Sequence, residues 1–205
     1  DLAGEVTVGE PLTYSQGGKT VIVVIDCGMK YGILRSLLAR GACVIRVPSS
    51  MSSEEIQKFE PAGVLVSNGP GDPKRCTKTI QTVRGLLEGG TPMMGICLGN
   101  QILALAAGAD TYKLPFGHRG SNQPCIDLGT MRCYITSQNH GYAVRAESLE
   151  GTGFQPSFLN ANDRTVEGIR HGEKPVFGVQ FHPEASPGPE DTAFLFDDFL
   201  RGVKP

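Results

Sequence analysis

Residues 95–99 read GICLG, a glycine–x–cysteine–x–glycine pattern that can present a nucleophile. It has the form of a nucleophile elbow, in which the reacting residue occupies a sharp turn between a strand and a helix. Glycine is needed on both sides because neighbouring side chains would clash in so strained a turn. At a helix N-terminus, free N–H groups and the helix dipole would stabilise the thiolate of Cys97. Taken alone, the pattern fits a buried structural cysteine equally well.

A base and an orienting acid for such a thiol lie near the other end of the chain. His182 and Glu184 follow an apolar strand predicted over residues 176–180, and their spacing puts both on one side of an extended chain. The carboxylate can then hold one imidazole nitrogen while the other faces the thiol. A His-Pro-Glu sequence alone is weak evidence for a catalytic pair, because most histidine–glutamate pairs of this kind are simply exposed on the surface. Together with Cys97 it forms a Cys…His-x-Glu triad.

Two further segments could complete a site. Residues 68–73 (NGPGDP) follow a buried strand and could be an ordinary turn, or a loop whose N–H groups join that of Leu98 in an oxyanion hole. Residues 137–142 (SQNHGY) could be a plain strand and turn, or a polar edge that recognises the amino-acid head of a substrate. We expect His140 within this segment to be structural rather than catalytic, and His118 to shape the pocket or contact a partner.

Composition narrows the function classes. The chain has 205 residues, of which 40% are hydrophobic and 20% charged, as in an ordinary globular protein. Its formal net charge of −2 gives no electrostatic reason to expect nucleic-acid or membrane binding. The six cysteines are scattered without a C-x-x-C pair, so neither zinc nor redox chemistry is indicated. We expect a cytoplasmic, reducing location.

The elements that must position these residues alternate between strands and helices. Strands are predicted over residues 20–26, 43–47, 63–67 and 91–96, and helices over 30–40, 77–88 and 99–107, with a further helix starting at Ser52. This alternation predicts an α/β fold with a mixed, mostly parallel central sheet and helices on both faces, of the flavodoxin-like kind. From residue 109 to 180 we expect short, partly antiparallel strands, followed by a closing helix over 192–200. Residues 1–19 are expected to be an N-terminal linker and 20–205 a single domain.

Over roughly residues 20–202 the chain resembles the class I glutamine amidotransferases. The resemblance rests on three motifs in order: NGPGDP at 68–73, GICLGNQ at 95–101 and HPE at 182–184. Within that class, residues 116–124 (FGHRGSNQP), 137–142 and 183–189 (PEASPGP) are similar to the glutaminase of carbamoyl-phosphate synthetase. Asn100 before Gln101 resembles the animal form, in which the glutaminase is one domain of a multifunctional pyrimidine-synthesis protein (carbamoyl-phosphate synthetase, aspartate transcarbamylase and dihydroorotase in one chain).

The resemblance implies roles for particular residues. Cys97, His182 and Glu184 would be the triad, and the N–H groups of Leu98 and Gly71 the oxyanion hole. The residues implied to bind L-glutamine are Gly69, Gly71, Leu98, Gln101, Asn139, Gly141 and Tyr142. The ammonia released would pass to a carbamoyl-phosphate synthetase domain of the same or an associated chain. No metal or cofactor is expected in this domain, since ATP and Mg²⁺ would belong to the synthetase.

Two alternatives stay open at this point. One is a stand-alone γ-glutamyl hydrolase or cysteine peptidase on the same fold, which would act on larger substrates and need an open cleft for them. The other is a non-catalytic regulatory or interaction module. A reactive thiol at Cys97 that glutamine protects from labelling would separate the glutaminase from such a module.

Overall fold

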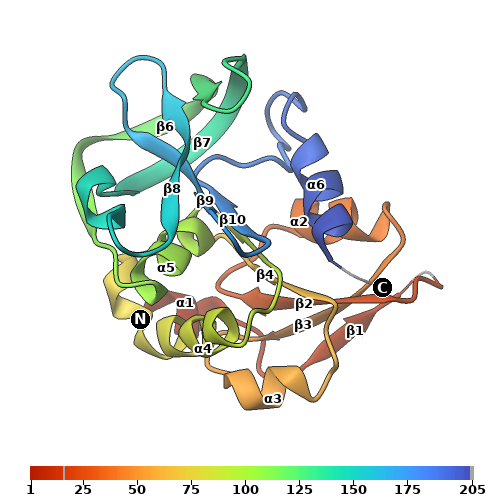
Figure 1. The fold of residues 1–205 in the computed structure, drawn as a ribbon. Coiled ribbons are helices and arrows are strands. Elements are labelled where there is room, and N and C mark those ends of the chain that lie inside the picture. The colour runs from red at the N-terminus through yellow and green to blue at the C-terminus, as the bar shows by residue number, and fades with distance from the viewer. Residues whose placement is uncertain (16, 204–205) are drawn as a thin grey trace.

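The computed structural model describes residues 1–15 and 17–203, and within them ten strands form one sheet (Figure 1). The strands are β1 (Leu12–Tyr14), β2 (Thr20–Asp26), β3 (Ala42–Pro48), β4 (Gly63–Val66), β5 (Met93–Ile96), β6 (Thr111–Asp127), β7 (Cys133–Val144), β8 (Phe154–Asn160), β9 (Val166–His171) and β10 (Val176–Val179). The α-helices are α1 (Leu2–Val6), α2 (Tyr31–Leu38), α3 (Ser53–Gln57), α4 (Thr77–Glu88), α5 (Leu98–Ala106) and α6 (Phe194–Gly202). Short 3₁₀ turns are η1 (Pro73–Arg75) and η2 (Ala146–Leu149). None of these helices is both long enough and apolar enough to cross a membrane.

One half of the sheet is parallel. Strands β3, β2, β4, β5 and β10 lie side by side in that order and pair in parallel. Counted along the chain this is the order 2-1-3-4-5, which is typical of flavodoxin-like folds. Strand β2 is a continuous apolar run because both of its faces are covered. Ile22 and Val24 pack in one core with α2 and α6, whereas Val23 and Ile25 pack in another with α3, α4 and α5.

The helices on one face are tied to each other as well as to the sheet. Arg40, just after α2, forms an ion pair with Asp197 of α6, with 2.8 Å between Nε and Oδ1. Its guanidinium also lies over the ring of Phe196, 5.5 Å from the centroid. Helices α2 and α6 therefore form a single layer over this face (Figure 1).

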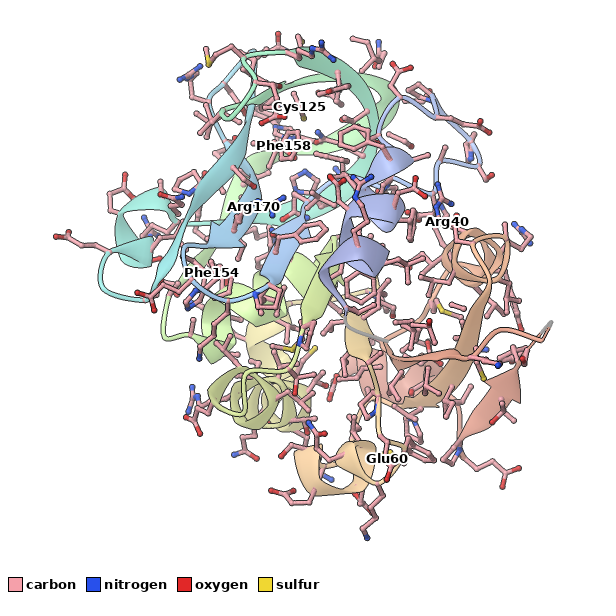
Figure 2. The ribbon with its side chains drawn as sticks, turned by 45° about the vertical axis from the view of Figure 1, so that its right-hand side comes forward. Arg40, Glu60, Cys125, Phe154, Phe158 and Arg170 are labelled. Atoms are coloured by element: carbon pink, nitrogen blue, oxygen red, sulfur yellow. The ribbon has the colours of Figure 1, made fainter. Side chains whose placement is uncertain are left out.

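The other half of the sheet is antiparallel and corrects two expectations. Beyond β10, strands β9, β7, β6 and β8 pair antiparallel, so the sheet is mixed, as expected, but it is not mostly parallel. Its strands are also not all short, because β6 has 17 residues and β7 has 12. Glycines that suggested turns instead lie within these strands, where the register shifts twice. Cys125 and Phe158 lie together in this half and belong to a buried core cluster (Figure 2).

The stretch expected to be a linker, residues 1–19, instead contributes secondary structure. Helix α1 begins after Asp1, whose carboxylate accepts a hydrogen bond from the N–H of Gly4, and its Ala3 is fully buried. Strand β1 pairs antiparallel with β3 at the edge of the sheet. Elements this short are stabilised by tertiary packing, which local sequence does not reveal. Gln16 of the expected linker, and residues 204–205 of the expected domain, lie outside the described residues.

Several local predictions are confirmed. The hydroxyl of Ser52 accepts a hydrogen bond from the N–H of Glu55 at 3.3 Å, and the Glu55 carboxylate accepts one from the N–H of Ser52 at 2.9 Å, which is a complete capping box at the start of α3. Strand β2 and helix α4 have the predicted bounds, and the other elements of the first half are shifted by only one or a few residues at their ends.

Candidate active site

Cys97 lies on the turn between β5 and α5, in a strained backbone conformation. Its φ is 55° and its ψ is −102°, a combination of backbone angles that residues other than glycine rarely adopt. The flanking glycines are required by close backbone approach. A Cβ on Gly95 would lie 2.6 Å from the carbonyl carbon of Gly99, and one on Gly99 would lie 2.0 Å from the oxygen of Val66. The predicted nucleophile elbow is therefore present.

His182 and Glu184 form a buried pair beside this turn. The distance between His182 Nδ1 and Glu184 Oε1 is 2.7 Å, and neither residue is more than 8% exposed. The N–H of His182 donates to the carbonyl of Ser137 at 2.9 Å, which fixes the position of the imidazole relative to β7. The ring also lies close enough to Cys97 for that group to raise the pKa of His182, and the two residues border one cleft. The three predicted triad residues thus form one connected group.

The electrostatics of this group favour a charged imidazole. Burial lowers the pKa of His182, but hydrogen bonds to Cys97 and Glu184 outweigh it and raise that pKa to about 10. Burial likewise works against ionisation of Glu184, yet the hydrogen bond and charge of His182, together with the charge of Lys30, lower its pKa. Both effects favour an ionised carboxylate that steadies an imidazolium.

Lys30 is a member of the site that sequence reasoning missed. Its Nζ lies 3.1 Å from Glu184 Oε1 and donates a hydrogen bond to the carbonyl oxygen of Ala185 at 2.7 Å. Lys30 is the residue before α2, at the carboxyl end of β2. The sequence does give one indication of this role, since Lys30 lies in the connection after the first parallel strand. Ligands in parallel sheets bind where the carboxyl ends of neighbouring strands diverge.

The loop over residues 68–73 is held against the elbow. A Cβ on Gly69 would lie 2.1 Å from the carbonyl oxygen of Cys27 and 2.8 Å from a methyl carbon of Leu98, so only glycine fits there. Gly71 has a φ of +97°. Among the described residues, the N–H groups of Gly71 and Leu98 have no hydrogen-bond acceptor, and both residues border the same cleft. They are free to donate to an oxyanion.

A cleft of about 730 Å³ lies over Cys97. The sequence-predicted site residues that border it are Gly69, Gly71, Cys97, Leu98, Gln101, Asn139, Gly141, Tyr142 and His182. Glu184 does not border it and lies behind His182. The cleft is formed by the segments that follow β2, β4, β5 and β10 in the parallel half and by β6 and β7 in the antiparallel half. Every predicted site residue is therefore brought to one place.

A second missed residue, Gln180, connects two of the predicted ones. Gln101 Nε2 donates to the carbonyl oxygen of Tyr142 at 2.8 Å and to Gln180 Oε1 at 2.9 Å. Gln180 Nε2 in turn donates to Cys97 Sγ at 3.6 Å. The sequence could have indicated that Gln180 belongs to the site. It lies two residues before His182 and so faces the same side of an extended chain.

His118, His140 and Glu167 form a cluster whose possible ligand atoms all lie within 4.8 Å of one another, and His140 borders the cleft. Hydrogen bonds link the members of the cluster to one another and to Gln138. Hydrogen bonds to Glu167 and Asp163, at 3.0 and 2.9 Å, outweigh burial and raise the pKa of His118 to about 9. Burial lowers the pKa of His140 to about 4, and its ring nitrogens contact Tyr142 O and Gln138 Oε1. His118 is thus a partly buried cation and His140 is uncharged at neutral pH.

Comparison with known proteins places this geometry in a family. The family model for class-I glutamine amidotransferases matches residues 23–201. Curated relatives named carbamoyl phosphate synthase small chain include those of Methanopyrus kandleri, 58% identical over 98% of this chain, Methanocaldococcus jannaschii, 53% over 98%, and Bacillus caldolyticus, 55% over 93%. These alignments cover 55%, 56% and 52% of the relatives' own lengths, so the chain spans about half of each.

A solved structure from Thermoplasma acidophilum, described as a GMP synthase protein, has the same fold. Its TM-score is 0.76 at 22% identity, covering 88% of this chain and 92% of that one. The three relatives above come from archaea and a bacterium, so the expected similarity to the animal multifunctional form stays a prediction.

Proposed function

Because the chain belongs to the class I glutamine amidotransferase family, we propose that it hydrolyses L-glutamine to glutamate and ammonia through a thioester on Cys97. The observation that carries the proposal is the buried His182–Glu184 pair, 2.7 Å apart, in contact with a thiol on a strained elbow. A nucleophile, a base and a group that orients the base are the parts that acyl transfer requires.

The reaction follows from the positions of these groups. The Cys97 thiolate attacks Cδ of glutamine, and the N–H groups of Leu98 and Gly71 donate to the oxyanion that forms. His182, kept protonated by Glu184, gives its proton to the leaving nitrogen, and ammonia departs. The imidazole then takes a proton from water, whose oxygen attacks the thioester and releases glutamate.

The remaining predicted residues would bind the amino-acid head of glutamine. Asn139, Gly141 and Tyr142 lie along one wall of the cleft on β7, opposite Gly69 in the oxyanion loop. Both amide hydrogens of Gln101 are already donated within the protein, which leaves its oxygen as an acceptor for a substrate donor.

The partner proposed for this activity is a carbamoyl-phosphate synthetase domain that consumes the ammonia. The support is the identity of 53–58% to chains named carbamoyl phosphate synthase small chain. Whether the synthetase belongs to the same chain, as in the animal form, or to a separate one is part of the prediction. Carbamoyl phosphate made in this way would enter pyrimidine synthesis in the cytoplasm, and ATP and Mg²⁺ would bind to the synthetase.

The test is Cys97→Ser in the full protein with its synthetase. We expect glutamine-dependent carbamoyl phosphate synthesis to fall by at least about a thousandfold, because the alkoxide of serine is far harder to form than the thiolate. Synthesis from added ammonia should be unchanged. Cys133→Ser, an exposed cysteine outside the cleft, is the matched control. Glutamine-dependent synthesis that survives in Cys97→Ser would refute the assignment.

Two further assays separate the alternatives. Preference for γ-glutamyl peptides over free glutamine would favour a stand-alone hydrolase. A non-catalytic module would be favoured if a glutamine-mimicking electrophile does not label Cys97, or labels it equally well when glutamine is present.

A further inference from the structure

Gln180 is fully buried next to the nucleophile, yet the mechanism above does not use it. It lies just after β10, between the strand and His182. Its side-chain nitrogen is 3.6 Å from Cys97 Sγ, within the distance at which an N–H donates to sulfur. A polar side chain without solvent access must find its partners in the protein. For Gln180, one of those partners is the reacting atom.

The orientation of this amide is set by its neighbours. Gln101 Nε2 donates to Gln180 Oε1, so the acceptor end of Gln180 faces Gln101 and the N–H₂ end faces the sulfur. Gln101 is held in turn, because its second amide hydrogen is donated to the carbonyl oxygen of Tyr142. The backbone N–H of Gln180 donates to the carbonyl oxygen of Glu167 at 2.8 Å. Reversing the Gln180 amide would place its N–H₂ group against that of Gln101 and its oxygen against the thiolate.

We propose that Gln180 is a further catalytic residue, which donates a hydrogen bond to the Cys97 thiolate and links it to the substrate-binding residue Gln101. The donor acts whenever the sulfur is negative, which happens twice in each cycle. It stabilises the thiolate before attack on Cδ. It acts again when water has added to the thioester, the carbon–sulfur bond breaks and the electron pair returns to sulfur. The proposal rests on the proposed glutaminase function for its role in turnover, but not for its effect on the thiol.

The decisive variant is Gln180→Glu, which has nearly the same shape and keeps an acceptor for Gln101 while replacing the donor at the sulfur with a carboxylate oxygen. The measurement is the pH dependence of Cys97 alkylation by iodoacetamide, in which the thiolate displaces iodide, followed by mass spectrometry of the peptide containing Cys97. We expect the alkylation midpoint to rise by about one pH unit or more, and the rate at pH 7 to fall about tenfold. Gln180→Met, which lacks both donor and acceptor, should shift the midpoint less than Gln180→Glu.

Glutamine hydrolysis in the full protein with its synthetase gives the second readout. Both variants should lower kcat for glutamine more than they raise KM, and ammonia-dependent synthesis should persist. Gln155→Met, an exposed glutamine on β8, is the matched control and should leave both readouts unchanged. Circular dichroism checks that each variant is folded. If Gln180→Met does not fold, the test rests on Gln180→Glu alone.

The outcomes distinguish this proposal from the function on which it partly rests. An unchanged alkylation profile in folded Gln180→Glu would overturn the role of Gln180, even if glutamine hydrolysis fell. A shifted profile in a protein whose glutamine hydrolysis does not need Cys97 would uphold the hydrogen bond and refute the proposed function.

Discussion

At the scale of single residues, the site is a line of alternating charge that begins at Lys30. The Lys30 ammonium lies 3.1 Å from Glu184, Glu184 lies 2.7 Å from His182, and His182 contacts Cys97. Each opposite charge stabilises its neighbour in a place from which water is largely excluded. Glu184 uses Oε1 for both partners, and among the described residues Oε2 has none. This carboxylate should therefore control the charge of the imidazole.

Glu184→Gln tests that control. An amide cannot stabilise an imidazolium as a carboxylate does, so we expect the pKa of His182 to fall from its raised value of about 10. The active pair needs a protonated imidazole, so the alkaline limb of the glutamine pH–rate profile should move to lower pH, with a fall in kcat of about a hundredfold or more. The exposed Glu150→Gln serves as control. An unmoved alkaline limb in Glu184→Gln would contradict the assignment.

At the scale of elements, a partly buried ion pair between His118 and Glu167 links two strands of the antiparallel half. His118 on β6 lies 3.0 Å from Glu167 on β9, which is fully buried, and 2.9 Å from Asp163 in the loop before β9. The same Glu167 lies 3.8 Å from His140 on β7, whose ring contacts the backbone of Tyr142. The pair therefore fixes β6 and β9 around the strand that carries the predicted substrate-binding residues.

His118→Gln should remove a pH-dependent part of the stability. Because hydrogen bonds to Glu167 and Asp163 raise the pKa of His118 from 6.5 to about 9, its stabilising effect is complete below pH 6.5 and is lost as the pH rises through 9. We expect the variant to be less stable by about 3 kcal/mol at pH 6, with a much smaller difference at pH 9.5. Urea unfolding at the two pH values measures this. An equal loss of stability at both pH values would show that the charge of His118 is not responsible for it.

At the scale of the whole molecule, the site exists because two differently built half-sheets meet at β10. The parallel half supplies Cys97, the loop over residues 68–73 and Lys30. The antiparallel half supplies β7, which carries residues predicted to bind the substrate. The opposite edge of the sheet is closed by β1, which covers β3 and leaves a three-residue strand outermost. Short edge strands of this kind limit pairing with other chains.

Deleting residues 1–14 should therefore destabilise the protein rather than shorten a linker. The deletion removes the buried Ala3, the hydrogen bond of 2.8 Å from the N–H of Val8 to Asp26, and the cover on β3. We expect the midpoint of thermal unfolding to fall by about 5 °C and aggregation on heating to increase. The exposed Glu10→Gln within the same segment is the control. A deletion variant with unchanged melting and solubility would restore the linker interpretation.

The features that sequence could predict are those whose cause is local. The covered strand β2, the capping box at Ser52 and the elbow around Cys97 each depend on neighbouring residues, and each is present as expected. The long antiparallel strands are harder to predict from sequence, because the pattern of a half-exposed strand with internal glycines resembles that of a series of turns.

The sequence by itself indicated the turn around Cys97 and the His182-x-Glu184 pair, because residue type and close spacing specify each of these two local patterns, although they lie far apart in the chain. Only the tertiary structure decided what surrounds them. Gln180 meets Cys97 across 83 residues, Lys30 meets the carbonyl of Ala185 across 155, and His118 meets Glu167 across 49. Contacts at such separations depend on how the whole sheet is ordered, and no local pattern encodes them.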